Sequence, residues 1–375
     1  MNIPFRQIIL TVILAVSSVA IGIMISASQN VQELVCKVEN SETKMANVAE
    51  SIDSDRQKGV HVFGRLDTNS MEPIVRSNFN WVTFVPYAGM NAYDSPSLRI
   101  HRGDSERKRR RDSMWCNNIK MVHDSGMKVF LKPHIWIRQS ENGKWRSDID
   151  PEGDENWKTW RESYREFILY YAELAERANA DMFCIGTELA ALSTKRPDFW
   201  LELIAEVRSI YSGELTYAAN WYKEYDRITF WDKLDYIGIQ AYFPLSKKEY
   251  ASVSEISKGW QKHLDEIESV HNKYGKKVLF TEMGYKSTND SAVKPWEWMD
   301  YSEQQKEKLS TETQANCYEA FFNSVWPKEW FAGVHIWQWR SSYYKSGGEE
   351  NLDFTPQRKP AESVIAKGFE NKLNE

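Results

Sequence analysis

The sequence predicts a closed, parallel (β/α)8 barrel as the folded part of this chain. From residue 58 onward, eight short apolar runs alternate with longer amphipathic segments. Continuous apolar strands separated by helices indicate parallel βα units, whose strands are buried on both faces. Eight such units in roughly 300 residues match the usual size of a (β/α)8 barrel. Polar, ionisable and aromatic residues also gather at one end of the strands, where such barrels carry their active sites.

The predicted elements follow one another along the chain in a regular order. The strands are residues 59–64, 81–86, 128–132, 182–186, 215–219, 236–240, 278–281 and 333–337. Helical patterns cover residues 104–125, 157–178, 198–211, 254–274 and 302–324. Ordinary turns, such as Asp124-Ser125-Gly126 and Tyr274-Gly275-Lys276, lead from a helix into the next strand. A doubly wound open sheet is the alternative, but no glycine-rich phosphate-binding motif follows any strand.

The N-terminal segment predicts export. Arg6 precedes an uncharged apolar stretch of 18 residues, 8–25, at the boundary between a signal-peptide core and a spanning helix. Ser26-Ala27-Ser28 is a loose match to a cleavage site, and the long apolar run favours an uncleaved anchor. We expect the rest of the chain in the periplasm or outside the cell. The predicted organisation is residues 1–27 as signal peptide or membrane anchor, 28–57 as linker and 58–375 as barrel.

Composition narrows the classes of function. The net charge of −5 argues against bulk attraction to nucleic acid. The basic run at residues 108–111 has acidic neighbours, so we interpret it as a solvated helix face, with contact to a membrane surface as the alternative.

Cys116, Cys184 and Cys317 lie in predicted helices and strands and are expected to be buried free thiols, with no disulfide framework or metal cluster. The 16 tryptophans suit core packing and stacking on sugar rings.

Two glutamates each end an apolar strand. Glu188 follows the run at residues 182–187, and Glu282 follows residues 278–281. An unpaired carboxylate is costly in a core, but it is well placed at the C-terminal mouth of a parallel barrel. The two residues therefore indicate the carboxylate pair of a glycosidase. Structural ion pairs are the alternative explanation.

Other chemically useful side chains follow the same strand ends. They are Lys132 and His134 at the third strand, Asn220 and Trp221 at the fifth, Tyr242 at the sixth, and His335, Trp337 and Trp339 at the eighth. The C-terminal ends of barrel strands meet at one face, so we expect these residues to surround the two glutamates.

Four motifs, taken together, resemble those of one known family. They are Leu131-Lys132-Pro133-His134-Ile135-Trp136, Ile185-Gly186-Thr187-Glu188-Leu189, Thr281-Glu282-Met283-Gly284-Tyr285 and Trp337-Gln338-Trp339. Over residues 58–370 the chain resembles glycoside hydrolase family 113. This resemblance implies a retaining β-mannan-degrading barrel with catalytic glutamates on strands 4 and 7. Many members of the wider clan have Asn directly before the acid/base, where this chain has Thr187.

The resemblance also implies roles for the site residues. Glu188 would be the acid/base and Glu282 the nucleophile. Tyr242 is expected to donate a hydrogen bond to Glu282, and Trp337 to form the floor beneath the reactive sugar. Lys132 and His134 would hold sugar hydroxyls, Asn220 or His134 would contact the 2-hydroxyl, and Trp339 would add a second platform. Simple packing is the alternative for each aromatic residue, since only some side chains of one strand can face the cleft.

The predicted function is a retaining glycoside hydrolase that cleaves β-mannosidic linkages in β-1,4-mannan or manno-oligosaccharides. Endo and exo action stay open, because loop length alone does not show whether the groove is blocked. The alternatives are an exo-β-mannosidase, a hydrolase of another β-linked glycan, a catalytically silent sugar-binding barrel and a structural envelope protein. The chemistry needs neither cofactor nor metal. We expect a monomer whose partners are its saccharide substrate and, through residues 8–25, the membrane.

Overall fold

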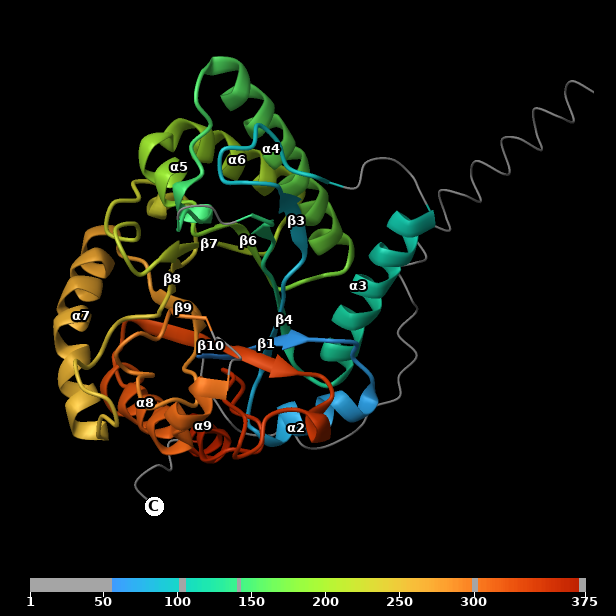
Figure 1. Cartoon of the computed structure of the whole chain (residues 1–375). Helices are drawn as coiled ribbons and strands as arrows, with labels where there is room; N and C mark the ends of the chain where they lie inside the picture. Colours follow the sequence, from blue (N-terminus) through green and yellow to red (C-terminus); the bar gives the residue numbers. More distant parts are fainter. Residues whose placement is uncertain (1–55, 101–105, 140–142, 299–302, 371–375) are drawn as a thin grey trace, which may run out of the picture.

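The computed structural model describes residues 56–100, 106–139, 143–298 and 303–370 and shows a closed parallel barrel (Figure 1). Around the barrel the strands follow the order β1-β10-β9-β8-β7-β6-β4-β2. The first strand closes the ring because it pairs in parallel with both β2 and β10. The strands are β1 (Gln57–Phe63), β2 (Trp81–Phe84), β4 (Lys128–Leu131), β6 (Met182–Thr187), β7 (Glu214–Asn220), β8 (Ile237–Gln240), β9 (Val278–Met283) and β10 (Phe331–Arg340). The predicted fold class is confirmed.

Helices surround the ring of strands in Figure 1. They are α2 (Thr68–Arg76), α3 (Glu106–Asp124), α4 (Asp154–Arg177), α5 (Ala190–Lys195), α6 (Pro197–Ile210), α7 (Val253–Tyr274), α8 (Thr311–Ser324) and α9 (Pro360–Phe369). Local sequence fixes several of their ends. In α7, Ser252 and Glu255 form a capping box at the start, and Gly275 ends the helix in a left-handed conformation.

A small second sheet lies beyond the barrel. Strands β3 (Tyr87–Met90) and β5 (His134–Ile137) pair in parallel with each other, just after β2 and β4. His134 was predicted at a strand end, and this pair of strands was not predicted. Such four-residue segments carry too little periodicity to be distinguished from loop. Because β3 and β5 directly follow the C-terminal ends of β2 and β4, they border the mouth of the barrel.

Two of the differences from the predicted helices have a local cause. The helix predicted from residue 302 begins at Thr311, after a 3-10 segment at Glu303–Lys308, and Ser310 caps it by accepting a hydrogen bond from the backbone of Thr313. Helix α2 was not predicted, because Pro73 lies inside it. Its start is well specified, since Asp67 and Ser70 form a capping box.

The strand that leads to Glu188 is packed directly against two helices. A Cβ added at Gly186 would lie 2.8 Å from atoms of Trp200, Tyr164 and Tyr217. Only a glycine allows α4 and α6 to approach β6 this closely. The end of β6 is therefore held in a rigid setting.

Two further expectations concern charge and cysteines. On α3, Lys108 pairs with Asp112 and Arg110 with Glu106, as expected for a solvated helix face. Cys184 and Cys317 are buried free thiols, as predicted. The expectation for Cys116 is wrong, because this residue is disulfide-bonded. A disulfide depends on the approach of a distant partner, which strand and helix patterns do not report.

The predicted signal or anchor at residues 1–27 and nearly all of the predicted linker fall outside the described residues. Within the part of the chain that the structure describes, no helix is both long and apolar enough to cross a membrane.

Candidate active site

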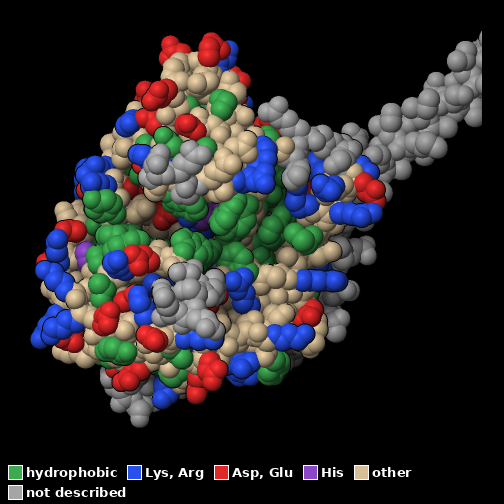
Figure 2. All heavy atoms as spheres, in the orientation of Figure 1, with side chains coloured by type: hydrophobic (Ala, Val, Ile, Leu, Met, Phe, Trp, Pro, Cys, Tyr) green, Lys and Arg blue, Asp and Glu red, His purple; other side chains and the backbone are tan. Residues whose placement is uncertain are grey.

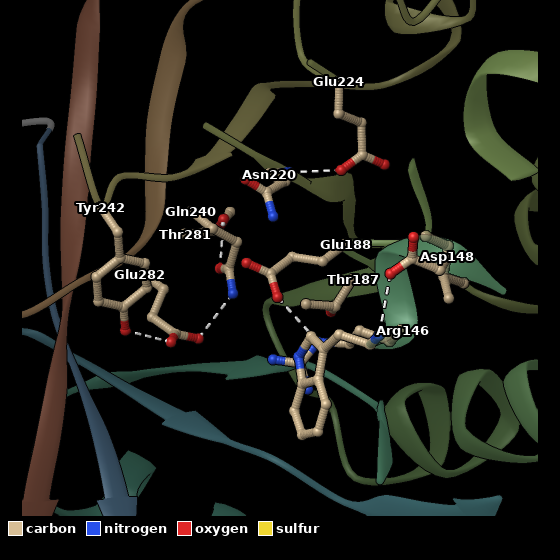
Figure 3. Close-up of polar contacts among 12 residues, drawn as sticks. Arg146, Asp148, Thr187, Glu188, Asn220, Glu224, Gln240, Tyr242, Thr281 and Glu282 are labelled. Atoms are coloured by element: carbon tan, nitrogen blue, oxygen red, sulfur yellow. Dashed lines mark hydrogen bonds and ion pairs between the residues drawn. The ribbon is translucent and has the colours of Figure 1, made fainter. Parts of the chain in front are cut away.

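The two glutamates predicted from the strand ends lie together at the mouth of the barrel. Glu188 directly follows β6, and Glu282 is the fifth residue of β9. Figure 3 shows both side chains pointing into the same space, Glu282 beside Tyr242 and Gln240, and Glu188 beside Arg146. Each is nearly buried, with 7% of Glu188 and 5% of Glu282 exposed. Buried carboxylates require partners, and the partners of the two differ.

Glu282 is surrounded by hydrogen-bond donors. Its Oε2 accepts from Lys132 Nζ at 2.7 Å and from Gln240 Nε2 at 2.8 Å. Its Oε1 accepts a hydrogen bond from the Tyr242 hydroxyl, which confirms the contact predicted for that tyrosine. Burial and the neighbouring Glu282 raise the pKa of Tyr242 well above its usual value, so the phenol keeps its proton and donates. Donors on both oxygens stabilise an ionised carboxylate.

Lys132 serves the carboxylate of Glu282 in this structure. Its side chain is fully buried, and its ammonium donates to Gln240 Oε1 at 3.1 Å, Thr281 O at 3.3 Å and Glu282 Oε2 at 2.7 Å. An ammonium has three protons, and these contacts use all of them. This arrangement differs from the predicted contact with sugar hydroxyls.

Glu188 has a single strong partner, which was not predicted from the sequence. Arg146 Nε donates to Glu188 Oε2 at 2.9 Å, and both side chains are at most 10% exposed. Arg146 lies in a 3-10 turn (Arg146–Asp148), and its guanidinium stacks on Trp145 at 5.0 Å from the ring centroid. The residue occupies a loop without periodicity, so no sequence pattern singled it out. A buried cation beside a carboxylate favours its ionised form.

His134 and Asn220 both keep polar atoms available near the glutamates. His134 is 3% exposed, and its Nε2 has no hydrogen-bond partner among the described residues. Burial, with Lys132 and Arg146 nearby, lowers the pKa of His134 well below its usual value, so the ring is neutral. Asn220 ends β7, and its Oδ1 accepts from the backbone of Tyr222 at 2.9 Å. Figure 3 shows the Asn220 amide beside Glu188.

The two tryptophans of the eighth strand have different environments. Trp337 packs with Tyr242 and Phe354, and its ring lies 4.9 Å from that of Phe63, at the barrel mouth. Trp339 is fully buried in the main core, 5.6 Å from the ring of Phe79. The predicted second platform at Trp339 is therefore not brought to the cleft. Trp337 remains in place for the predicted floor.

Exposed aromatic rings form the rim of the site. On one side, Trp136 lies 6.2 Å from Tyr87, and both are more than 40% exposed. On the other side, the Trp221 and Trp296 rings are 5.2 Å apart, and Trp298 lies 6.3 Å from Trp337. Figure 2 shows hydrophobic side chains gathered around the hollow at the centre of this face. Flat rings on both sides of paired carboxylates suit a saccharide chain, whose sugar faces present C–H groups.

The described residues contain no group of three or more His, Cys, Asp or Glu side chains arranged to hold a metal ion. The chemistry available to the site is that of two carboxyl groups in unlike settings. Glu282 has hydrogen-bond donors on both oxygens, whereas Glu188 contacts one guanidinium and otherwise faces the cleft. Unlike environments for two carboxyls are typical of an enzyme that uses one as a nucleophile and the other to transfer a proton.

Comparisons with known proteins agree with this geometry. Two solved GH113 enzymes superpose over most of their length. A GH113 β-1,4-mannanase is 28% identical, with a TM-score of 0.70 over 84% of this chain and 99% of its own. A GH113 β-mannanase from Alicyclobacillus acidocaldarius is 26% identical, with a TM-score of 0.69 over 86% of this chain and 99% of its own.

More distant likeness extends to the barrel alone. The β-glucuronidase of Faecalibacterium prausnitzii is 13% identical, with a TM-score of 0.53 over 84% of this chain and 49% of its own, and shares only the fold. A search of curated proteins finds no match. The model of glycoside hydrolase family 113 matches residues 52–359, which confirms the resemblance drawn from the motifs. This chain is therefore a glycoside hydrolase and belongs to family 113.

Proposed function

We propose that this enzyme cleaves β-mannosidic linkages with retention of configuration, using Glu282 as nucleophile and Glu188 as acid/base. The observation that carries the proposal is the unequal setting of the two glutamates. Lys132, Gln240 and Tyr242 hold Glu282 ready as an anion, while Glu188 has one partner and an open side towards the cleft. The mannose specificity rests on the two GH113 mannanases, whose folds cover nearly the same length.

The reaction would proceed in two displacements. In the first, a Glu282 oxygen attacks the anomeric carbon while Glu188 gives its proton to the departing glycosidic oxygen. This step leaves a glycosyl ester on Glu282 and an ionised Glu188. In the second, Glu188 takes a proton from water, the water oxygen attacks the same carbon, and the Glu282 carboxylate departs. Two inversions give overall retention.

Substrate contacts follow from the groups left free around the pair. His134 Nε2 is buried and without a partner, and a sugar hydroxyl would supply one. Asn220 can offer its amide to the same sugar, and Trp337 can stack beneath it. The rings of Trp136 and Trp296, on opposite sides of the mouth, would extend binding to neighbouring sugars of an oligosaccharide or polysaccharide. An exo-acting β-mannosidase and a hydrolase of another β-linked glycan are the competing assignments.

The cellular setting is a second part of the proposal. The uncharged stretch at residues 8–25, with Arg6 before it, supports export to the periplasm or the cell exterior, either free or anchored at the membrane. We also propose that the enzyme works as a monomer. Fractionation of cells that express the full chain, followed by N-terminal sequencing, would distinguish a cleaved from an anchored form.

The proposed activity is tested by incubating the full chain with manno-, gluco- and xylo-oligosaccharides of several lengths. We expect cleavage of the manno series alone, with the β anomer as the first product seen by NMR. Products from the middle of long chains would identify endo action, and single sugars released from one end would identify exo action. First release of the α anomer, or turnover of a different series only, would contradict the proposal.

Arg146 gives a prediction about the placement of Glu188. In Arg146→Met, the guanidinium that contacts Glu188 Oε2 at 2.9 Å is lost, so the carboxyl is no longer fixed in direction. We expect kcat to fall by roughly 10- to 100-fold, since a small misplacement of a catalytic group costs that order. The rate is measured on a manno-oligosaccharide beside Arg165→Met, which changes a solvent-exposed arginine paired with Glu206. A wild-type kcat in Arg146→Met would rule out this influence of Arg146.

A further inference from the structure

A third buried glutamate lies behind the active site. Glu224 follows β7 and is completely inaccessible to solvent. Its Oε1 accepts from Tyr217 OH at 2.6 Å and from Ser193 Oγ at 2.7 Å. Its Oε2 accepts from the backbone N–H of Asn220 at 2.6 Å. One carboxylate therefore joins β7, the loop after it and helix α5.

One of these contacts continues to the backbone next to Glu188. The N–H of Leu189 donates to the Tyr217 hydroxyl at 2.8 Å, and that hydroxyl donates its proton to Glu224. Glu188 has a φ of 52°, a left-handed conformation that is uncommon for a residue with a side chain. A conformation of this kind persists only where the surroundings fix it. The link from Leu189 through Tyr217 to Glu224 is such a restraint.

The other oxygen of Glu224 fixes Asn220. The backbone of Asn220 donates to Glu224, and its side-chain oxygen is occupied by the backbone of Tyr222. These two contacts leave the Asn220 amide nitrogen for the cleft. Figure 3 shows Glu224 behind Asn220, on the side away from Glu282. The same carboxylate thus supports the proton-transfer residue and a predicted substrate contact.

We propose that Glu224 is a positioning residue for hydrolysis, which holds the backbone at Glu188 and Asn220 and places negative charge behind Glu188. The inference rests on the role proposed for Glu188. It adds a charge opposed to that of Arg146, which donates a hydrogen bond to the carboxylate of Glu188. An acid/base carboxyl must be protonated to give a proton and ionised to take one. A nearby cation such as Arg146 favours the ionised form, and a nearby anion such as Glu224 favours the protonated form.

The titration of Glu224 supports this role. Burial raises the pKa of Glu224 to about 7, and the nearby charge of Glu188 adds to the rise, whereas the donors Tyr217, Ser193 and Asn220 oppose it. Tyr217 stays protonated, because burial raises its own pKa well above the usual value. Glu224 therefore loses its charge as the pH falls below neutrality, and with it the influence on Glu188.

Two variants test the link to Leu189 and the charge of Glu224. Glu224→Gln removes the charge and also replaces one of the two acceptor oxygens by a donor nitrogen. Tyr217→Phe keeps the charge but removes the link to Leu189. In Glu224→Gln we expect kcat to fall by roughly 10- to 100-fold, the cost of a small misplacement, and the alkaline limb of kcat/KM to move to lower pH. Tyr217→Phe should lower kcat with the limb in place. Glu202→Gln, on the exposed side of α6, is the matched control.

A second measurement does not depend on turnover. The carboxyl carbon of Glu188 is followed by 13C NMR against pH in the full chain and in Glu224→Gln, with Glu188→Gln for assignment. We expect its midpoint to move to lower pH in the variant, even if the wild-type chain fails to cleave mannosides and the proposed function is wrong. An unmoved midpoint, or a variant with wild-type kcat and only a lower melting temperature, would reduce Glu224 to a structural residue.

Discussion

Glu282→Ala is expected to lower kcat/KM on manno-oligosaccharides by roughly 100,000-fold, the order seen when an enzyme loses its nucleophile. The loss corresponds to about 7 kcal/mol of transition-state stabilisation. Among the described residues, Glu282 is the carboxylate that accepts hydrogen bonds from Lys132, Gln240 and Tyr242, so we expect no other residue to form the glycosyl ester in its place. Steady-state kinetics on a fluorogenic mannoside with an activated leaving group measure the effect.

Azide identifies the missing group in Glu282→Ala. A small anion that fits the space left by the carboxylate should attack the anomeric carbon and give the α-mannosyl azide, the product of one inversion. Glu202→Gln should retain wild-type kinetics, since this residue is exposed on α6. Residual activity within about 100-fold of wild type, once contaminating enzyme is excluded, would show that Glu282 is not the nucleophile.

The loss of activity in Glu188→Ala is expected to depend on the leaving group of the substrate. On manno-oligosaccharides, whose leaving groups are poor, kcat/KM should fall by roughly 1,000-fold, within the range for general acid catalysis. On a dinitrophenyl mannoside, which needs no protonation, the first step should stay close to wild type. The second step should become slow, because no base activates water, and a burst of dinitrophenol should precede the steady state.

Azide again gives the control for Glu188→Ala. It needs no general base, so it should accelerate the slow second step and yield the β-mannosyl azide. The alkaline limb of the pH profile should also disappear, since its titrating group is gone. A loss of equal size on activated and natural substrates, with no burst, would contradict the assignment of Glu188 as acid/base.

The residues that could be predicted from the sequence share one property. Glu188, Glu282 and Tyr242 each lie at or just after the end of a short apolar strand, and a parallel barrel brings all such strand ends to one face. That these three residues lie close together therefore follows from the order of strands and helices alone. The family motifs then indicated which catalytic role each of these residues has.

Arg146 and Glu224 could not be predicted in this way. Both lie in loops, where no periodicity relates sequence to direction. Glu224 belongs to a polar segment, Tyr222-Lys223-Glu224, that has the composition of an exposed turn, and it is buried only because Tyr217 and Ser193 converge on it. Lys132 was predicted at the correct strand end. Its side chain extends across the barrel to Glu282 on β9, a direction that the sequence does not indicate.

The prediction for Trp339 was wrong because an irregularity in β10 interrupts the regular alternation of side chains along the strand. Residues two apart in a regular strand face the same side, so Trp337 and Trp339 would point together. The pairing of β1 with β10 slips here, with Val60 opposite Ile336 and Val62 opposite Trp339. The additional residue on β10 is typical of a bulge and separates the faces of the two tryptophans. Sequence patterns do not report the register of pairing.

The buried pair of Lys132 and Glu282 has a consequence for how this enzyme can change. Removing one partner leaves an uncompensated charge in the barrel interior, a cost of about 3–5 kcal/mol that is a large share of a typical folding free energy. Replacing both by apolar residues of similar volume is often neutral or stabilising. We therefore expect a double variant with apolar residues at both positions to be more stable than either single variant, although it would lack the proposed nucleophile.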